Sequence, residues 1–507
     1  MGKGRKHNDQ RGASSTASED DRARLRQSGI KPDITIDGRK LEGGGQLLRI
    51  ALCLSALTRQ SIYVSNIRGN RTGQRGLKNQ HLACVQALAV ACNARTIGAK
   101  VGSQDLLFAP GQGQQEQDQQ GLTDVVHKGK VYKARKLQIS PATPGAITLI
   151  MQAVIPYLVF KEDSTPTELS IRGATHTTSS PSIDYIDAVL IPNLIAFGLP
   201  GSCIQRISNN SLKHTHTITT FGLVHYLITP LLDRTIILQS PPVKALDVED
   251  TKSSSARGRI LHAYVLFGTS SYFTICMQSA IHHLKTAINQ EMIFAAFESL
   301  TVHFAVADSP SFEDARFSET CTSALHEDDD SYHPSAEPMK GSYPIYMQLA
   351  ADLPGGTVEG ADARFTSTDK NRRKSGESSI DAVFAAAAGS AVDALKQELD
   401  GCKRYGSNMD VHMRDQIIVF LGLLGGRVTP RQLQSSEKAD QEQIDGEWDD
   451  KHGLSLHAQT AIWVTQLMLG VEFDADGAGV ARGWLAKQGV KISPTAEMLK
   501  TMIPRNC

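Results

Sequence analysis

One histidine near the end of the 507-residue chain lies in a setting suited to a nucleophile or a general base. His457 falls in residues 454–460, just before an amphipathic run at 461–469 that is predicted to be helical. The dipole of a helix disfavours protonation of a histidine in its first turn, so the ring stays neutral, and the same helix end attracts phosphate. A capping or half-buried histidine with no part in chemistry fits the same pattern, and both interpretations stay open on this residue alone.

Two glycine-containing segments in the N-terminal part of the chain could hold phosphate groups. Residues 42–46 (EGGGQ) form a turn ahead of a helix-like run at 47–57, and helix N-termini attract anions. Residues 66–76 (NIRGNRTGQRG) combine arginines with glycines, so that guanidinium groups and backbone N–H groups can both reach phosphate oxygens. Neither segment is a P-loop or a dinucleotide fingerprint. A tight strand-to-helix turn and a solvated basic loop are the alternatives.

The charges of the chain are unevenly distributed although they sum to zero, with 53 basic and 53 acidic residues. Residues 43–104 contain no aspartate or glutamate. The basic residues in that window give it a charge of +8: Arg49, Arg59, Arg68, Arg71, Arg75, Lys78, Arg95 and Lys100. The overall balance therefore excludes neither a nucleotide nor a nucleic acid as a partner.

The elements that must position these residues alternate in type along the chain. Apolar residues recur at helical spacing in residues 47–57, 81–92, 147–158, 183–197, 380–399, 416–424 and 460–469. Short β-like runs lie among them at residues 34–36, 61–64, 106–108 and 169–171. This order predicts an α/β or α+β protein built from similar units.

Composition narrows the class of protein further. No run of about 18 apolar residues is present, so we expect no membrane span. The first 27 residues lack the apolar stretch of a secretory signal, and residues 1–30 have too little apolar content to fold. The eight cysteines are scattered without a CxxC pair, which favours a reducing compartment over a zinc module or a disulfide scaffold.

A series of short motifs, taken together, resembles the RNA 3′-terminal phosphate cyclase family. In chain order these are residues 37–49 (DGRKLEGGGQLLR), 66–71 (NIRGNR), 76–82 (GLKNQHL), 101–104 (VGSQ), 149–156 (LIMQAVIP), 181–185 (PSIDY), 414–417 (RDQI) and 456–462 (LHAQTAI). The motifs keep the order of that family over about residues 31–200 and 380–475.

The resemblance implies an α+β fold of three repeated units, each with two helices on a four-stranded sheet. Each unit would resemble the C-terminal domain of bacterial translation initiation factor three, and the third would carry a smaller α/β insert domain. The expected boundaries are a disordered tail at 1–30, cyclase repeats one and two with the start of repeat three at 31–246, the insert at 247–364, the remaining cyclase domain at 365–490 and a C-terminal tail at 491–507.

The resemblance also implies an activity, namely ATP-dependent conversion of an RNA 3′-phosphate to a 2′,3′-cyclic phosphate. The route would pass through a covalent histidine–AMP and an RNA-adenylate, with release of pyrophosphate and AMP. His457 would be the nucleophile, and Glu42 would hold Mg²⁺ or Mn²⁺. The residues expected to bind the phosphates of ATP or RNA are Arg49, Arg68, Arg71 and Gln80. Those expected to border the adenylate are Gln104, Asp415 and Gln416.

Two departures from the pattern of the family concern the nucleotide pocket and the third unit. His412 occupies the position where a tyrosine often precedes the DQ motif, so stacking in the adenine pocket is expected to differ. Residues 204–238 lack the Tyr-Pro-x-Gly-Gly-Gly run that usually follows the second unit.

A non-catalytic branch of the same family gives the alternative function, a nucleolar cyclase-like factor for assembly of the small ribosomal subunit. That branch lacks the nucleophilic histidine. The presence of His457 with Arg68, Arg71 and Glu42 favours the enzyme. Either function is expected in the nucleus, in the nucleoplasm or the nucleolus.

An enzyme that grips one terminal phosphate, rather than coating RNA, should release few counterions on binding. We expect the logarithm of the RNA affinity to fall with the logarithm of the salt concentration with a slope equivalent to about two to four released counterions. Fluorescence anisotropy of a labelled RNA 3′-phosphate over a range of salt concentrations measures this slope. A slope near about ten would show broad backbone binding instead.

Overall fold

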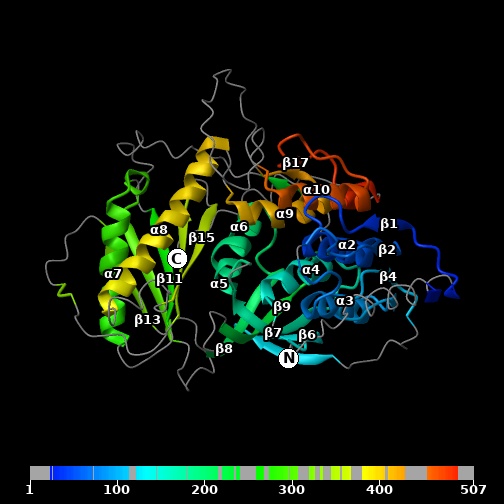
Figure 1. Cartoon of the computed structure of the whole chain (residues 1–507), viewed down its shortest axis with the longest axis horizontal. Helices are drawn as coiled ribbons and strands as arrows, with labels where there is room; N and C mark the ends of the chain where they lie inside the picture. Colours follow the sequence, from blue (N-terminus) through cyan, green and yellow to red (C-terminus); the bar gives the residue numbers. More distant parts are fainter. Residues whose placement is uncertain are drawn as a thin grey trace, which may run out of the picture.

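Two large hydrophobic cores organise the chain, and in each of them helices cover one face of a β-sheet (Figure 1). The computed structural model describes residues 23–24, 27–71, 73–113, 122–143, 145–177, 180–214, 220–232, 236–239, 259–267, 273–295, 297–306, 319–325, 332–334, 344–353, 357–366, 379–405, 409–428 and 454–488. The predicted tail at 491–507 and most of the predicted tail at 1–30 lie outside these residues. No helix in these ranges is long and apolar enough to cross a membrane.

The first sheet has the strand order β1-β2-β4-β3. Its strands are β1 (Ile34–Asp37), β2 (Ile62–Ser65), β3 (Arg95–Ile97) and β4 (Leu106–Ala109). Two helices accompany it, α2 (Gly45–Thr58) and α3 (Asn79–Ala91). α2 links the parallel strands β1 and β2, and every residue from Gln46 to Ala56 is buried. α2 is therefore an interior helix, which explains its nearly unbroken apolar sequence.

The second sheet has the order β5-β6-β7-β9-β8. Its strands are β5 (Thr123–His127), β6 (Lys130–Ile139), β7 (Thr167–His176), β8 (Ile204–His214) and β9 (Thr220–Ile228). α4 (Ile147–Phe160) joins the parallel strands β6 and β7, and α5 (Ile183–Tyr185), the π-helical turn η1 (Ile186–Leu190) and α6 (Ile191–Ala196) follow β7. Residues 204–228, where the expected glycine-rich run is absent, contribute an antiparallel pair of strands to this sheet.

A third, shorter group completes the first core. It contains α9 (Val411–Leu424), α10 (Leu456–Leu469) and α11 (Trp484–Lys487), with a sheet of β10 (Leu238–Gln239), β16 (Gly426–Arg427) and β17 (Gly479–Val480). The expected four strands are thus present in the first sheet, whereas five and three described strands form the other two. The mixed α+β class is confirmed, and the equivalence of three repeated units stays a prediction.

The second core lies under a five-stranded sheet of order β13-β12-β11-β14-β15. Its strands are β11 (Ile260–Phe267), β12 (Ser299–Val306), β13 (Glu319–Ala324), β14 (Pro344–Asp352) and β15 (Val358–Thr366). It also contains α7 (Phe273–Asn289), the short 3₁₀ turn η3 (Met292–Phe294) and α8 (Ile380–Tyr405). The core extends to Leu399 because α8 packs on β14, β15 and α7. This helix lies beyond residue 364, where the expected insert ends, and its apolar face belongs to the second core.

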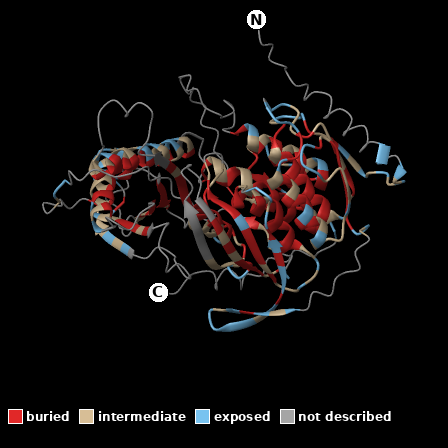
Figure 2. Ribbon diagram, turned by 60° about the horizontal axis from the view of Figure 1, so that its bottom comes forward, coloured by how far each residue is buried: buried red, intermediate tan, exposed pale blue. Residues whose placement is uncertain are grey.

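The helices that carry the polar residues of interest pack together inside the first core. α2 contacts α4 and α10, and α9 contacts α4 and α10. Buried residues are concentrated in these helices, which are red in Figure 2. Phe160 at the end of α4 meets Phe420 of α9 edge to face, with the ring centroids 5.7 Å apart. This contact fixes the two helices relative to each other.

Substitution of one of these rings tests how much the packing of α4 against α9 contributes to the stability of the fold. Phe420→Ala should lower the free energy of unfolding by about 3–5 kcal/mol, because it leaves a cavity between α4 and α9. Val126, with 66% of its surface exposed on β5, provides the control, and Val126→Ala should change the free energy of unfolding by no more than about 0.5 kcal/mol. Denaturant titrations followed by circular dichroism measure both values. Equal effects of the two substitutions would contradict the packing described here.

Candidate active site

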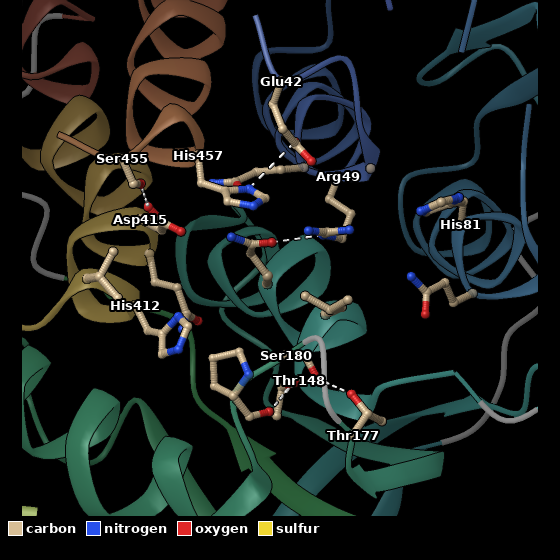
Figure 3. Close-up of a pocket in the computed structure, with 18 of the residues that line it drawn as sticks. Glu42, Arg49, His81, Thr148, Thr177, Ser180, His412, Asp415, Ser455 and His457 are labelled. Carbon is tan, nitrogen blue, oxygen red and sulfur yellow. Dashed lines mark hydrogen bonds and ion pairs between the residues drawn. The ribbon is translucent and has the colours of Figure 1, made fainter. Parts of the chain in front are cut away.

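The first turns of five described helices converge on one cavity of about 730 Å³ (Figure 3). α2, α3, α4, α9 and α10 each contribute lining residues from their N-terminal ends. Backbone N–H groups at helix N-termini lack partners within the helix, and the helix dipoles add positive potential there. The cavity is therefore suited to an anionic ligand before any charged side chain is considered.

His457 lies in the first turn of α10 and lines this cavity. Ser455 caps the helix by accepting a hydrogen bond from the backbone N–H of Ala458, and its hydroxyl donates to Asp415. Nδ1 of His457 lies 2.6 Å from Oε1 of Gln46. Because an amide oxygen only accepts hydrogen bonds, Nδ1 carries a proton, so Nε2 is the nitrogen that holds the lone pair in the uncharged form of the ring. With 38% of the side chain exposed, the ring is accessible to a ligand.

Glu42 approaches the same histidine from the turn before α2. Its Oε2 lies 3.5 Å from Nδ1 of His457, while its Oε1 pairs with Arg71. Only 6% of the glutamate side chain is exposed, and Oε2 accepts no hydrogen bond within the part of the chain that the structure describes. A buried carboxylate oxygen with spare acceptor capacity fits a divalent cation that takes its other ligands from water and phosphate. The described residues offer no group of three or more metal-ligating side chains, so such a cation would depend on its ligand.

Arg49 places a buried positive charge on the wall of the cavity formed by α2. Only 5% of this residue is exposed, and its Nε donates to Oε1 of Gln152 on α4 over 2.8 Å. Burial lowers the pKa of the guanidinium to about 10, against the smaller opposing effects of Cys84 and Asp415. The group still carries its charge at neutral pH, and the amide of Gln152 fixes its orientation.

His81, in the first turn of α3, is held neutral beside these cations. Burial lowers its pKa to about 3, helped by the charges of Arg49, Arg68 and Lys78. Its Nδ1 accepts a hydrogen bond from the backbone N–H of Lys78. Gly45 allows the ring to come this close, because a Cβ there would lie 2.8 Å from Nη1 of Arg49 and still nearer to the His81 ring. This is the requirement that the glycines of residues 42–46 meet.

The basic loop between β2 and α3 supplies the remaining cations. Arg68 adopts a left-handed backbone conformation (φ 57°) and donates from its guanidinium to the carbonyl of Gln74. Burial lowers the pKa of Arg68. Arg71 and Lys78 line the cavity together with Arg68. The loop is therefore a wall of the site rather than a detached solvated segment.

Most of the residues expected from the sequence meet in this cavity. Those that line it are Glu42, Arg49, Arg68, Arg71, Gln80, Asp415, Gln416 and His457. Gln104 is the exception, because it does not line the cavity and instead accepts a hydrogen bond from the backbone N–H of Ile67 through its carbonyl. Its backbone thus supports the Arg68 loop, and its place beside an adenylate stays a prediction.

Gln152 is the amide of the site that the sequence analysis missed. It is a polar residue in an otherwise apolar helical run, four positions after Thr148, so both side chains lie on one helix face. That isolated polar residue was the available signal. Thr148 also lines the cavity and donates to the carbonyl of Pro181, which attaches the loop after β7 to α4.

The two sides of the cavity differ in character. Arg49 and His81 lie on one side in Figure 3, and His412 and Asp415 lie on the other. Because Arg68 and Lys78 act on the His81 pKa, they belong to the first side. Asp362 belongs to the second side. Burial raises its pKa, and the charge of His412 is one of the smaller effects that lower it. A ligand with an anionic end and a neutral end fits this polarity.

Comparisons with known proteins agree with this geometry. A family model described as RNA 3′-terminal phosphate cyclase matches residues 40–475. Proteins named RNA 3′-terminal phosphate cyclase are 41% identical over 169 residues in Methanosarcina mazei, 33% over 201 residues in Pyrococcus furiosus and 39% over 166 residues in Methylococcus capsulatus. These alignments cover 33%, 40% and 33% of this chain and 42%, 51% and 42% of the relatives. The aligned part of the chain thus spans about half or less of the length of the curated relatives it matches. Because the family model extends over most of the chain, the protein belongs to the RNA 3′-terminal phosphate cyclase family.

Proposed function

We propose that this protein is an ATP-dependent enzyme that converts an RNA 3′-phosphate to a 2′,3′-cyclic phosphate. The observation that carries the proposal is the setting of His457 at the N-terminus of α10. Gln46 fixes its Nδ1 proton, and the ring faces a cavity that contains Arg49, Arg68 and Arg71. These are the requirements for a neutral nitrogen nucleophile that attacks a phosphate ester.

In the first step Nε2 of His457 attacks the α-phosphorus of ATP. A nitrogen–phosphorus bond forms, the bond from the α-phosphorus to the bridging oxygen breaks, and pyrophosphate leaves with that electron pair. Positive charge develops on the imidazole, and Gln46 Oε1, which accepts from the Nδ1 proton over 2.6 Å, can stabilise this charge. The arginines neutralise the charge of the leaving group.

In the later steps AMP passes from His457 to the 3′-phosphate of RNA and is then displaced. The terminal phosphate attacks the phosphorus of the histidine adenylate, and the histidine leaves as a neutral ring. The neighbouring 2′-hydroxyl then attacks the activated 3′-phosphorus, loses its proton and expels AMP. A phosphate monoester alone has no good leaving group, so adenylylation is what makes ring closure feasible.

A divalent cation, Mg²⁺ or Mn²⁺, fits beside Glu42. When bound, it would neutralise phosphate charge and hold the phosphate oxygens in place. Glu42 Oε2 would be its protein ligand, while Arg71 continues to hold Oε1.

Covalent labelling tests the role of His457. Incubation with α-labelled ATP and Mg²⁺ or Mn²⁺ should give a labelled protein whose bond is labile in acid and stable in base, as expected of a phosphoramidate. His457→Ala should abolish the label, because the nucleophile is gone. His127→Ala provides the matched control, since His127 lies on β5 and does not line the cavity, and it should label like the wild type. Absence of a His457-dependent label with either metal would instead favour the non-catalytic ribosome-assembly alternative.

A second experiment compares two glutamines. Gln152→Ala should lower the rate of self-adenylylation by about 10- to 100-fold, because Arg49 loses the acceptor that orients its guanidinium. Gln104→Ala should leave the rate within about twofold, since only the backbone of Gln104 is used, and side-chain changes away from such contacts have small effects. Single-turnover labelling gives both rates. The opposite ranking would return Gln104 to the nucleotide site.

A further inference from the structure

One strand of the second core reaches the cavity of the first. β15 belongs to the five-stranded sheet under α7 and α8, yet Asp362 on this strand lines the cavity. Among the described residues it is the only lining residue that comes from that sheet. Its neighbours on the cavity wall include Pro181 and His412, on the side away from the arginines.

Hydrogen bonds two and four residues before Asp362 fix β15 against the first core. The backbone N–H of Gly360 donates to Asp410 over 3.1 Å, and Asp410 is the N-cap of α9, the helix that carries His412. At Val358 the backbone N–H and carbonyl both bond the side chain of Asn193. The strand is thus attached to the same helix that forms the neighbouring wall, so the position of Asp362 is set before any ligand arrives.

Ser182 and Tyr346 hold the carboxylate of Asp362 in place through hydrogen bonds. Oδ2 accepts from the backbone N–H of Ser182 over 2.7 Å, and Oδ1 accepts from the hydroxyl of Ser182 over 3.0 Å. The hydroxyl of Tyr346 is a third donor. An ionised carboxylate has about four acceptor positions, so one remains for the cavity. Burial raises the pKa of Asp362, whereas these hydrogen bonds and the charge of His412 lower it.

The polarity of the cavity places the base of a bound nucleotide beside Asp362. A nucleoside triphosphate must put its phosphates near Arg49, Arg68 and His457, which leaves the base on the side of His412. There the base meets a fixed acceptor. An exocyclic amino group donates to such an acceptor, whereas a carbonyl oxygen at the same ring position is repelled by it.

We propose that Asp362 is a specificity-determining residue that reads the 6-amino group of adenine and rejects purines with a carbonyl at that position. The second core thereby contributes to substrate selection through a single side chain on β15. This inference rests on the proposed function, because it takes the ligand of the cavity to be a nucleoside triphosphate. One unpaired acceptor facing a carbonyl, where adenine gives a charge-assisted hydrogen bond, corresponds to about 10- to 100-fold discrimination.

The test compares ATP with inosine triphosphate, which differs by a carbonyl in place of the 6-amino group. Self-labelling rates and dissociation constants for both nucleotides are measured for the wild type and for Asp362→Asn. In this variant the amide oxygen can keep the backbone N–H of Ser182 and the amide nitrogen can keep its hydroxyl, so the second amide N–H points to the cavity. The group that residue 362 presents to the cavity thus changes from a hydrogen-bond acceptor to a hydrogen-bond donor. The preference for ATP over inosine triphosphate should fall by about tenfold or more.

Ser182→Ala is the matched control for a purely structural effect. It removes the hydroxyl contact behind Asp362 and the N-cap hydrogen bond that the hydroxyl accepts from the backbone N–H of Tyr185, but it keeps the backbone N–H that bonds Oδ2, and Ser182 does not itself line the cavity. Both nucleotides should be affected to the same extent, so that their ratio stays at the wild-type value. A thermal unfolding curve for each variant confirms that the comparison is made on folded protein.

The outcomes separate this inference from the proposed function. An unchanged ratio in Asp362→Asn, in a wild type that labels with ATP, overturns the role of Asp362 and leaves the cyclase proposal standing. A wild type that never labels overturns the proposed chemistry, while the two dissociation constants still decide the selectivity. Equal affinity of the wild type for ATP and inosine triphosphate overturns the inference in either case.

Discussion

The buried charge of Arg49 is the constraint around which the cavity is built. A cation with 5% exposure needs compensation, and the interior of α2 offers only apolar neighbours apart from Gln46 and Ser55. Gln152 supplies one acceptor, and the electrostatic influence of Asp415 supplies part of the opposite charge. An anionic ligand in the cavity would add to this compensation. Burial is the main cause of the low pKa of His81, and the charge of Arg49 lowers it further.

The residues that could be predicted from the sequence are those whose chemistry is visible along one segment. The glycine-rich turn after Glu42, the arginine-rich loop of residues 66–76 and the histidine in the first turn of α10 are each local signals. Gly45, Arg68, Arg71 and His457 from these segments line one cavity. Gln104 belongs to one of the motifs but does not line this cavity, and the hydrogen bond that it makes to Ile67 is through its backbone carbonyl. Gln152 stands out locally as a polar residue in an apolar run, but its pairing with Arg49 depends on the approach of α4 to α2, which the sequence pattern does not give.

The fold, like the site, could be predicted only where its features are local in sequence. Periodicity located the helices that bury one face, as at 147–158, but it could not show which core each helix joins. α8 is an amphipathic segment by its sequence, and only the position of β14 and β15 assigns it to the second core. The role of Asp362 could not be predicted for the same reason. Its strand, β15, is distant in sequence from every motif, and it reaches the cavity only because the second core packs against the first.

Buried carboxyl groups are prominent where β15 meets α9 at the junction of the two cores. Asp410 and Glu359 are buried there, and burial raises the pKa of both, as it raises the pKa of Glu398 to about 7. Groups of like charge packed together are stabilised when some of them are protonated and share hydrogen bonds. Asp410 accepts from the Tyr185 hydroxyl and from the backbone of Met413 and Gly360, so it ties α5, α9 and β15 to one point. Hydrogen bonds of this kind depend on direction as well as distance. A junction held in this way can keep Asp362 and His412 in a fixed relation, which a set of exposed salt bridges would not do.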